Sequence, residues 1–143
     1  MNKKAFTILE LLVVISVLAI LIGIAIPRIK GMQQAGQITQ VKAELQTLQS
    51  ATESYFSTNQ SYPAGSSGAT AMTTLVAATP QILSTQLNDP FNSSSAYGYY
   101  STGNYYVWYS QGVASSSITD TVSTTGVVTS ASGGYCSSIG TGC

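Results

Sequence analysis

The chain has 143 residues, and its five basic and five acidic side chains give a formal net charge of zero. Charged residues make up 7% of the sequence, against about a quarter in a typical soluble domain. A dedicated nucleic-acid binder is disfavoured because such proteins carry an excess of positive charge. The sequence has no histidine and only two cysteines, which excludes histidine-based catalysis and the common zinc sites. We therefore expect a protein that is not an enzyme and that binds no cofactor or metal.

The segment 6–26 is predominantly apolar and carries a single charge, Glu10. As a helix, its 21 residues would extend about 30 Å, which matches the hydrocarbon core of a bilayer. Leu, Ile and Val occupy every face of this helix, so it either crosses a membrane or is buried among copies of itself. A cleaved secretory signal peptide and a plain single-span anchor are simpler interpretations of such a segment. Neither of them accounts for Glu10.

A carboxylate within an apolar span costs about 2.5–3.5 kcal/mol on insertion scales, so Glu10 needs a partner. Cleavage of the chain between Ala5 and Phe6 would supply one, because the new α-amino group lies four residues before Glu10. In a parallel, staggered stack of helices, the amine of one copy can meet Glu10 of its neighbour. Such a buried pair would fix the axial register between copies.

The stretch Ala5-Phe6-Thr7-Ile8-Leu9-Glu10, followed by an apolar run and Pro27, resembles the class III signal of type IV pilins and type II secretion pseudopilins. The resemblance implies that a prepilin peptidase removes residues 1–5 and that Phe6 becomes N-methylated. It also implies storage in the inner membrane, followed by polymerisation of the chain with copies of itself. An inner-membrane platform protein and an assembly ATPase would drive that polymerisation.

Two positions depart from the pattern of this family. Members usually have glycine before the cleavage site, where this chain has Ala5. Many also have glycine eight residues before the proline, where this chain has Ala19.

Beyond Pro27 the sequence becomes amphipathic, and apolar residues such as Val41, Leu45 and Leu48 recur at helical spacing. We expect one helix over 6–59, with a transmembrane or assembly half at 6–26. Pro27 removes a helical hydrogen-bond donor. It either kinks the helix at the membrane boundary or, as the family suggests, lets the helix bend or melt during assembly.

The remaining residues, 60–143, are expected to form a globular head with a short helix over 69–78. The expected turns and strands are Asp89-Pro90-Phe91-Asn92, a hairpin of 97–101 and 104–110 around Thr102-Gly103, and a weaker pair, 118–122 and 126–131. The predicted fold is α+β, a long helix packed on a small antiparallel sheet of three or four strands.

Aromatic residues are concentrated in 97–109, where seven occur within 13 residues. Strand alternation places Tyr106 and Trp108 on one face, and Tyr105, Val107 and Tyr109 on the other. One face is expected to pack against the helix. The other face would contact neighbouring subunits, or offer stacking surfaces to sugars or single-stranded nucleic acid. The absence of basic residues near these rings favours packing.

The turn at Asp89 and the strand that follows also resemble major pseudopilins, which commonly hold calcium in the next loop. The corresponding stretch here, 110–133, has 12 hydroxyl residues and a single acid, Asp120. Calcium needs six to eight oxygen ligands, with carboxylates among them, so we expect no calcium site.

Cys136 and Cys143 are the two cysteines of the chain. Oxidised, they would close a loop and constrain the unfolded tail by about 2–2.5 kcal/mol. This resembles the carboxy-terminal disulfide loop of many pilins, and the alternative is a pair of free thiols.

The sequence thus predicts the major pilin of a type IV pilus, held in the inner membrane before assembly and on the cell surface afterwards. The alternatives are a type II secretion major pseudopilin, and a minor or competence pilin that binds DNA or glycan.

Overall fold

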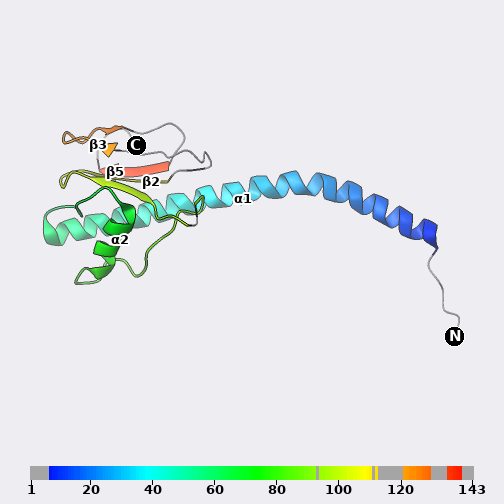
Figure 1. The fold of residues 1–143 in the computed structure, drawn as a ribbon, viewed down its shortest axis with the longest axis horizontal. Helices are drawn as coiled ribbons and strands as arrows, with labels where there is room; N and C mark the ends of the chain where they lie inside the picture. The colour runs from blue at the N-terminus through cyan, green and yellow to red at the C-terminus, as the bar shows by residue number, and fades with distance from the viewer. Residues whose placement is uncertain (1–6, 93, 111, 113–120, 130–134, 140–143) are drawn as a thin grey trace. The chain divides into compact units, whose positions relative to one another are not determined.

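The structure is a computed structural model that describes residues 7–92, 94–110, 112, 121–129 and 135–139, with Pro27 and Ile139 described by their backbone alone (Figure 1). The chain divides into two compact units, Met1–Gly36 and Gln37–Cys143. Helix α1 (Ile8–Asn59) supplies residues to both units. Its bounds agree closely with the helix expected over 6–59.

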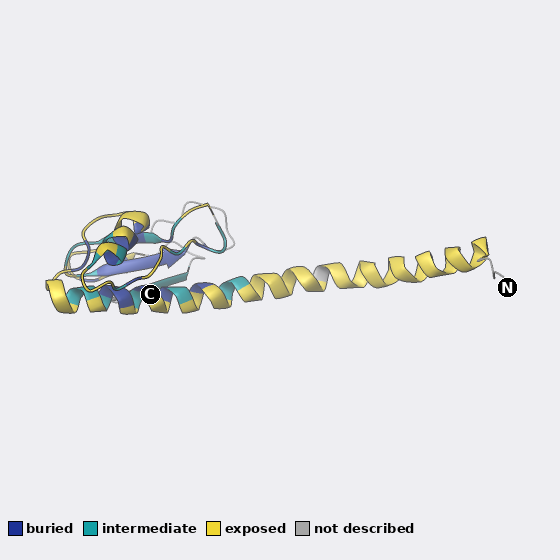
Figure 2. Cartoon of the chain, turned by 90° about the horizontal axis from the view of Figure 1, so that it is seen from below, coloured by how far each residue is buried: buried dark blue, intermediate teal, exposed yellow. Residues whose placement is uncertain are grey.

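The first unit contains the apolar part of α1. Every described side chain from Thr7 to Gly36 is exposed, as the yellow stretch of Figure 2 shows. The helix continues through position 27 without a break. A proline inside a helix lacks the donor for one backbone hydrogen bond, and the surrounding turns maintain the helix here.

The second unit is built on the remaining part of α1, residues 37–59. Side chains spaced three or four residues apart on this part, Val41, Leu45 and Leu48, are buried, which is the pattern of a helix with one face in a core. Helix α2 (Gly68–Ala77) adds Met72 and Leu75 to the same core. The short helix expected over 69–78 is confirmed, displaced by one residue.

The main sheet has three antiparallel strands in the order β1-β2-β5, which span Gly98–Ser101, Tyr106–Ser110 and Tyr135–Ile139. Strands β1 and β2 form the expected hairpin, with Ser101 opposite Tyr106. A long helix packed on a small antiparallel sheet is the α+β fold that the sequence predicts.

Two details of the sheet differ from the prediction. Strands β3 (Thr121–Val122) and β4 (Val128–Thr129) do pair, but they form a separate two-stranded sheet, and the expected strand residues 118–120, 130 and 131 lie outside the described residues. The third strand of the main sheet is β5, which the sequence analysis did not identify. Its sequence, Tyr-Cys-Ser-Ser-Ile, has no alternation of apolar and polar residues, so only the backbone pairing with β2 defines it.

Both faces of β2 are covered. Tyr106 and Trp108 join the core formed with α1, while Val107 packs with Val122 and Val128 of the small sheet. The expectation that one face is left open for neighbours or ligands is therefore wrong. Every residue of β2 is buried, because the small sheet covers the side that α1 leaves.

Candidate functional site

The start of α1 is fixed by Thr7. The Thr7 hydroxyl accepts a hydrogen bond from the backbone N–H of Glu10 at 3.2 Å, and the Thr7 carbonyl accepts one from Leu11. A threonine followed three residues later by glutamate is the capping-box pattern of a helix amino terminus. The carboxylate of Glu10 also lies in the first turn, where the helix dipole favours negative charge. This local role was not among the expectations from the sequence, although the Thr-x-x-Glu spacing indicates it.

The first unit exposes a continuous apolar surface. In the described part of the chain, all exposed large hydrophobic residues except Val127 lie between Ile8 and Met32. By its length and composition, helix α1 is long and apolar enough to cross a membrane. The Ser16 hydroxyl donates to the Leu12 carbonyl at 2.6 Å, so this polar group is satisfied within the helix. Apolar surface of this extent marks a contact with lipid or with protein.

The other residues expected at the assembly site are placed only in part. Ala5 and Phe6 lie outside the described residues, so the cleavage site and the N-methylation of Phe6 stay predictions. The assembly role of Pro27 is likewise untested. Cys136 lies in β5, opposite Tyr109. Its pairing with Cys143 stays a prediction, because Cys143 is also outside the described residues.

In the second unit, two carboxylates of α1 accept hydrogen bonds from tyrosine hydroxyls. Tyr97 donates to Oε2 of Glu44 at 2.6 Å. Glu53 accepts from two tyrosines, with Tyr106 at 2.9 Å from Oε1 and Tyr62 at 3.1 Å from Oε2. Hydrogen bonds to an ionised acceptor are roughly twice as strong as neutral ones. These contacts therefore fix both the position and the rotation of α1 against the tyrosine-bearing segments.

Burial and these carboxylates raise the tyrosine pKa values. Desolvation, together with the nearby charge of Glu53, raises the pKa of Tyr62 to about 12. The pKa values of Tyr97 and Tyr106 rise further, again first through desolvation and then through their hydrogen bonds to Glu44 and Glu53. Burial also raises the pKa of Tyr99, whose hydroxyl donates to the Pro63 carbonyl. These four tyrosines are therefore neutral hydrogen-bond donors at physiological pH.

Neutral groups complete the contact between α1 and the sheet. The indole N–H of Trp108 donates to the Thr52 hydroxyl at 2.9 Å, and that hydroxyl donates to the Leu48 carbonyl. The Ser137 hydroxyl of β5 donates to the side-chain oxygen of Gln49 at 2.6 Å. Thus β5, which periodicity did not reveal, is attached to the helix by a side-chain hydrogen bond.

The expected turn at Asp89 is confirmed, and its carboxylate has two identified hydrogen-bond donors. Oδ1 accepts from the backbone N–H of Phe91, and Oδ2 accepts from the Ser110 hydroxyl at 2.7 Å. Asp89 and Ser110 are both buried. The carboxylate therefore fastens the end of β2 to the turn. Among the described residues, no group of three or more acidic, histidine or cysteine side chains is arranged to hold a metal ion.

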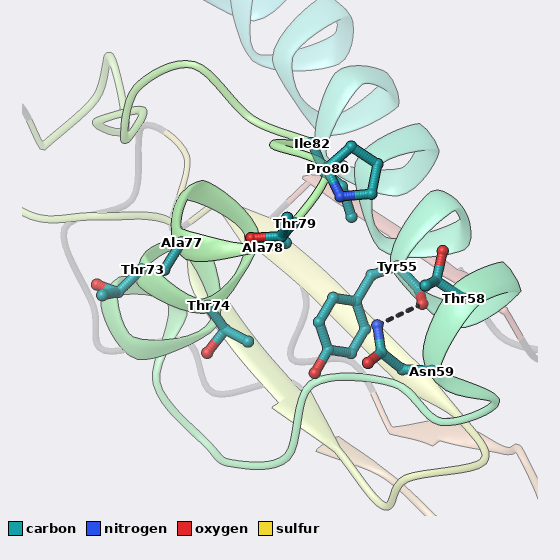
Figure 3. A pocket seen from close by; sticks show the side chains of 10 residues that line it. All are labelled: Tyr55, Thr58, Asn59, Thr73, Thr74, Ala77, Ala78, Thr79, Pro80 and Ile82. Atoms are coloured by element: carbon teal, nitrogen blue, oxygen red, sulfur yellow. Dashed lines mark hydrogen bonds between the residues drawn. The ribbon is translucent and has the colours of Figure 1, made fainter.

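The second unit also contains an open cavity of about 440 Å³ (Figure 3). Tyr55, Thr58 and Asn59 line it from the last turns of α1, and residues of α2 and of the segment after α2 complete it. In Figure 3 the Tyr55 ring lies between the end of α1 and Thr74 of α2. The sequence analysis placed possible ligand contacts on the strands and gave no signal for this cavity.

Comparison with known proteins bears on the first unit. Residues 1–26 match the family model described as the prokaryotic N-terminal methylation motif. No curated protein and no solved structure matches the chain. The match supports a class III signal peptide in a type IV pilin-like or pseudopilin-like protein. In general terms, the motif implies processing by a prepilin peptidase and assembly into a filament, and it fits a membrane-anchored subunit that later joins a surface structure.

Proposed function

We propose that the chain is the major pilin of an extracellular type IV pilus, a structural subunit rather than an enzyme. The observation that carries this proposal is the first unit. This unit combines the methylation motif with the part of α1 up to Gly36, in which every described side chain is exposed. Such a surface is suited first to lipid and then to other copies of the same helix, whose contact buries apolar area worth roughly 25 cal/mol per Å².

Assembly would begin with the subunit held in the inner membrane by residues 6–26. Cleavage after Ala5 creates a positive α-amino group at Phe6, which becomes N-methylated. The carboxylate of Glu10 has no hydrogen-bond or ion-pair partner among the described residues, although its backbone N–H is capped by Thr7. In the filament this carboxylate would receive the Phe6 amine of a neighbouring copy, with the platform protein and the ATPase supplying the driving machinery.

A major pilin is favoured over a secretion pseudopilin by the carboxylates of the head. Glu44, Glu53 and Asp89 all accept hydrogen bonds within the head. Asp120 is the remaining acid of residues 37–143. A calcium site, which the pseudopilin alternative expects, needs carboxylates that are available to the ion. If the alternative holds, the melting temperature of the full chain falls when calcium is replaced by EDTA, whereas a pilin head without calcium melts at the same temperature in both.

The replacement Glu10→Gln tests the assembly step. Glutamine, like glutamate, occurs at this position of the capping box, so the replacement preserves the start of α1 while it removes the charge. We expect processed protein to accumulate in the membrane and sheared filaments to fall at least tenfold. Ser16→Ala is the matched control, since it removes a hydroxyl bonded only to its own helix and alters no charge. Filaments at the wild-type level with Glu10→Gln would contradict the proposal that Glu10 pairs with the amine.

A further inference from the structure

The cavity between α1 and α2 has no role in the assembly account. Its volume of about 440 Å³ falls in the range of about 300–1,000 Å³ that is common for small-molecule sites. Three structural parts of the head form it: the last turns of α1, the carboxy-terminal half of α2 and the segment 78–82. All of them pack in the second unit, so the cavity does not depend on the placement of the apolar helix.

The lining of the cavity is neutral and mixes hydrogen-bonding with apolar groups. Its polar members are Tyr55, Thr58, Asn59, Thr73, Thr74 and Thr79, and its apolar members are Ala77, Ala78, Pro80 and Ile82. No acidic or basic side chain lines it. An anion such as a nucleotide would find no counter-charge there, and a purely apolar ligand would leave the hydroxyls without partners.

Several lining groups have hydrogen-bonding capacity to spare. The Asn59 amide nitrogen donates to the Tyr55 carbonyl at 3.0 Å, and its side-chain oxygen is left as an acceptor. The Thr74 hydroxyl donates to the Thr70 carbonyl at 3.1 Å, and its lone pairs are left to accept. Within the described residues, the hydroxyls of Tyr55, Thr58 and Thr79 have no hydrogen-bond partner. A ligand that fits these groups must both donate and accept.

The two helices that border the cavity both end there, α1 at Asn59 and α2 at Ala77. The carboxy terminus of a helix carries a partial negative charge, which favours ligands that bring donors and disfavours anions. A sugar ring meets all of these conditions. Its hydroxyls donate and accept, its C–H faces are apolar, and it carries no charge.

We propose that this cavity binds one ring of a neutral carbohydrate. The apolar face of the sugar lies on the Tyr55 ring, and its hydroxyls bond the threonines and Asn59. Figure 3 shows the Tyr55 ring among the side chains that line the cavity, between Thr74 of α2 and Asn59 at the end of α1. The proposal is independent of the filament and holds for any assembly state that leaves the cavity open.

The test uses the full chain in a detergent without a sugar head group, since glycoside detergents would compete. Saturation-transfer NMR is recorded with methyl glycosides of glucose, galactose, mannose and N-acetylglucosamine. We expect saturation transfer to at least one of them, with a dissociation constant on the order of 1 mM. Tyr55→Phe retains the ring and weakens binding a few-fold, whereas Tyr55→Leu abolishes it. Fluorescence of Trp108 verifies that each variant is folded.

Ala77→Phe provides a second test, because it fills the cavity from an exposed position of α2. Ala69→Phe is its matched control on the same helix, also exposed and outside the cavity. Binding should fall at least tenfold in the first variant and stay unchanged in the second. The absence of transfer to every sugar, or equal binding by both variants, would overturn the proposal. Loss of self-association in Ala77→Phe, with no sugar bound by the wild type, would also overturn it and assign the cavity to a second copy of the chain.

Discussion

The two parts of helix α1 are continuous in backbone and opposite in their surroundings. Residues 8–36 bury no described side chain, whereas residues 37–59 bury Val41, Leu45 and Leu48 against the head of the same chain (Figure 2). The first part packs on no described residue of the chain, whereas the second part packs on the head. The proposed function assigns the first part to assembly, and the second part serves folding.

The carboxylates of the helix show the same division. Glu44 and Glu53 accept hydrogen bonds from tyrosines of their own chain. The side chain of Glu10 has no such partner among the described residues. In the proposed assembly, the Glu10 carboxylate receives a cation from another copy of the chain. The carboxylates of the head already stabilise the fold of their own chain.

A matched pair of leucines gives the largest expected difference between the two parts. Leu48 is 0% exposed and Leu18 is 49% exposed. Leu48→Ala should lower the free energy of unfolding of the head by about 2–5 kcal/mol, because it leaves a cavity in the core. Leu18→Ala should change it by less than about 0.5 kcal/mol. Denaturant unfolding followed by Trp108 fluorescence measures both, and equal losses would show that the apolar helix is part of the head's core.

The carboxylates provide the second comparison. Glu53→Leu leaves the hydroxyls of Tyr62 and Tyr106 without their acceptor, at a cost of about 1–2 kcal/mol each because both hydrogen bonds are only partly buried, so we expect a loss of about 2–4 kcal/mol. Glu53→Gln keeps one acceptor oxygen and should cost less. Glu10→Leu should leave the same Trp108 transition unchanged. The account of the head would be wrong if Glu53→Leu unfolded at the wild-type denaturant concentration.

The two parts of the molecule also differ in which of their features the sequence predicts. The apolar run and the periodicity of Val41, Leu45 and Leu48 are local signals, so the bounds of α1 were predicted closely; the cap at Thr7 is also local, although the prediction did not use it. The hairpin at Thr102-Gly103 is local too. Strand β5 and the pairing of Glu53 with Tyr62 and Tyr106 depend on residues far apart in the chain, and no local pattern marks them.

Glycine replacements give a third comparison with a smaller expected effect. A Cβ added at Gly68 would overlap the Tyr97 carbonyl oxygen, so Gly68→Ala should destabilise the head by about 1–3 kcal/mol. A Cβ added at Gly23 meets no described atom within 4 Å, and alanine favours a helix by about 1 kcal/mol over glycine. Gly23→Ala should therefore leave the unfolding transition of the head unchanged. It should also slow hydrogen exchange of the backbone amides near position 23. A head of Gly68→Ala with wild-type stability would contradict the close packing of α2 on Tyr97.

The smallest expected effect is that of pH on the free energy of unfolding, since the tyrosines change it only in alkaline solution. The folded-state pKa of Tyr62 is raised from 10.0 to about 12, so the folded state retains its proton more strongly than the unfolded state. The resulting stability is complete below pH 10.0 and is lost as the pH rises through about 12. Residues 8–36 contain no tyrosine and should not contribute. The part of the phenolate absorbance that comes from the buried tyrosines should appear at the pH at which Trp108 fluorescence reports unfolding, and ionisation of all tyrosines well before unfolding would contradict the buried network.

The most direct test of the central claim is mass spectrometry of the amino terminus of the protein in filaments sheared from the cell surface. The account predicts abundant protein that begins at N-methylated Phe6, because only that cleavage creates the amine that Glu10 can receive. Protein that retains Met1, or that begins beyond Ala25, would contradict the assembly of this chain through its amino-terminal helix.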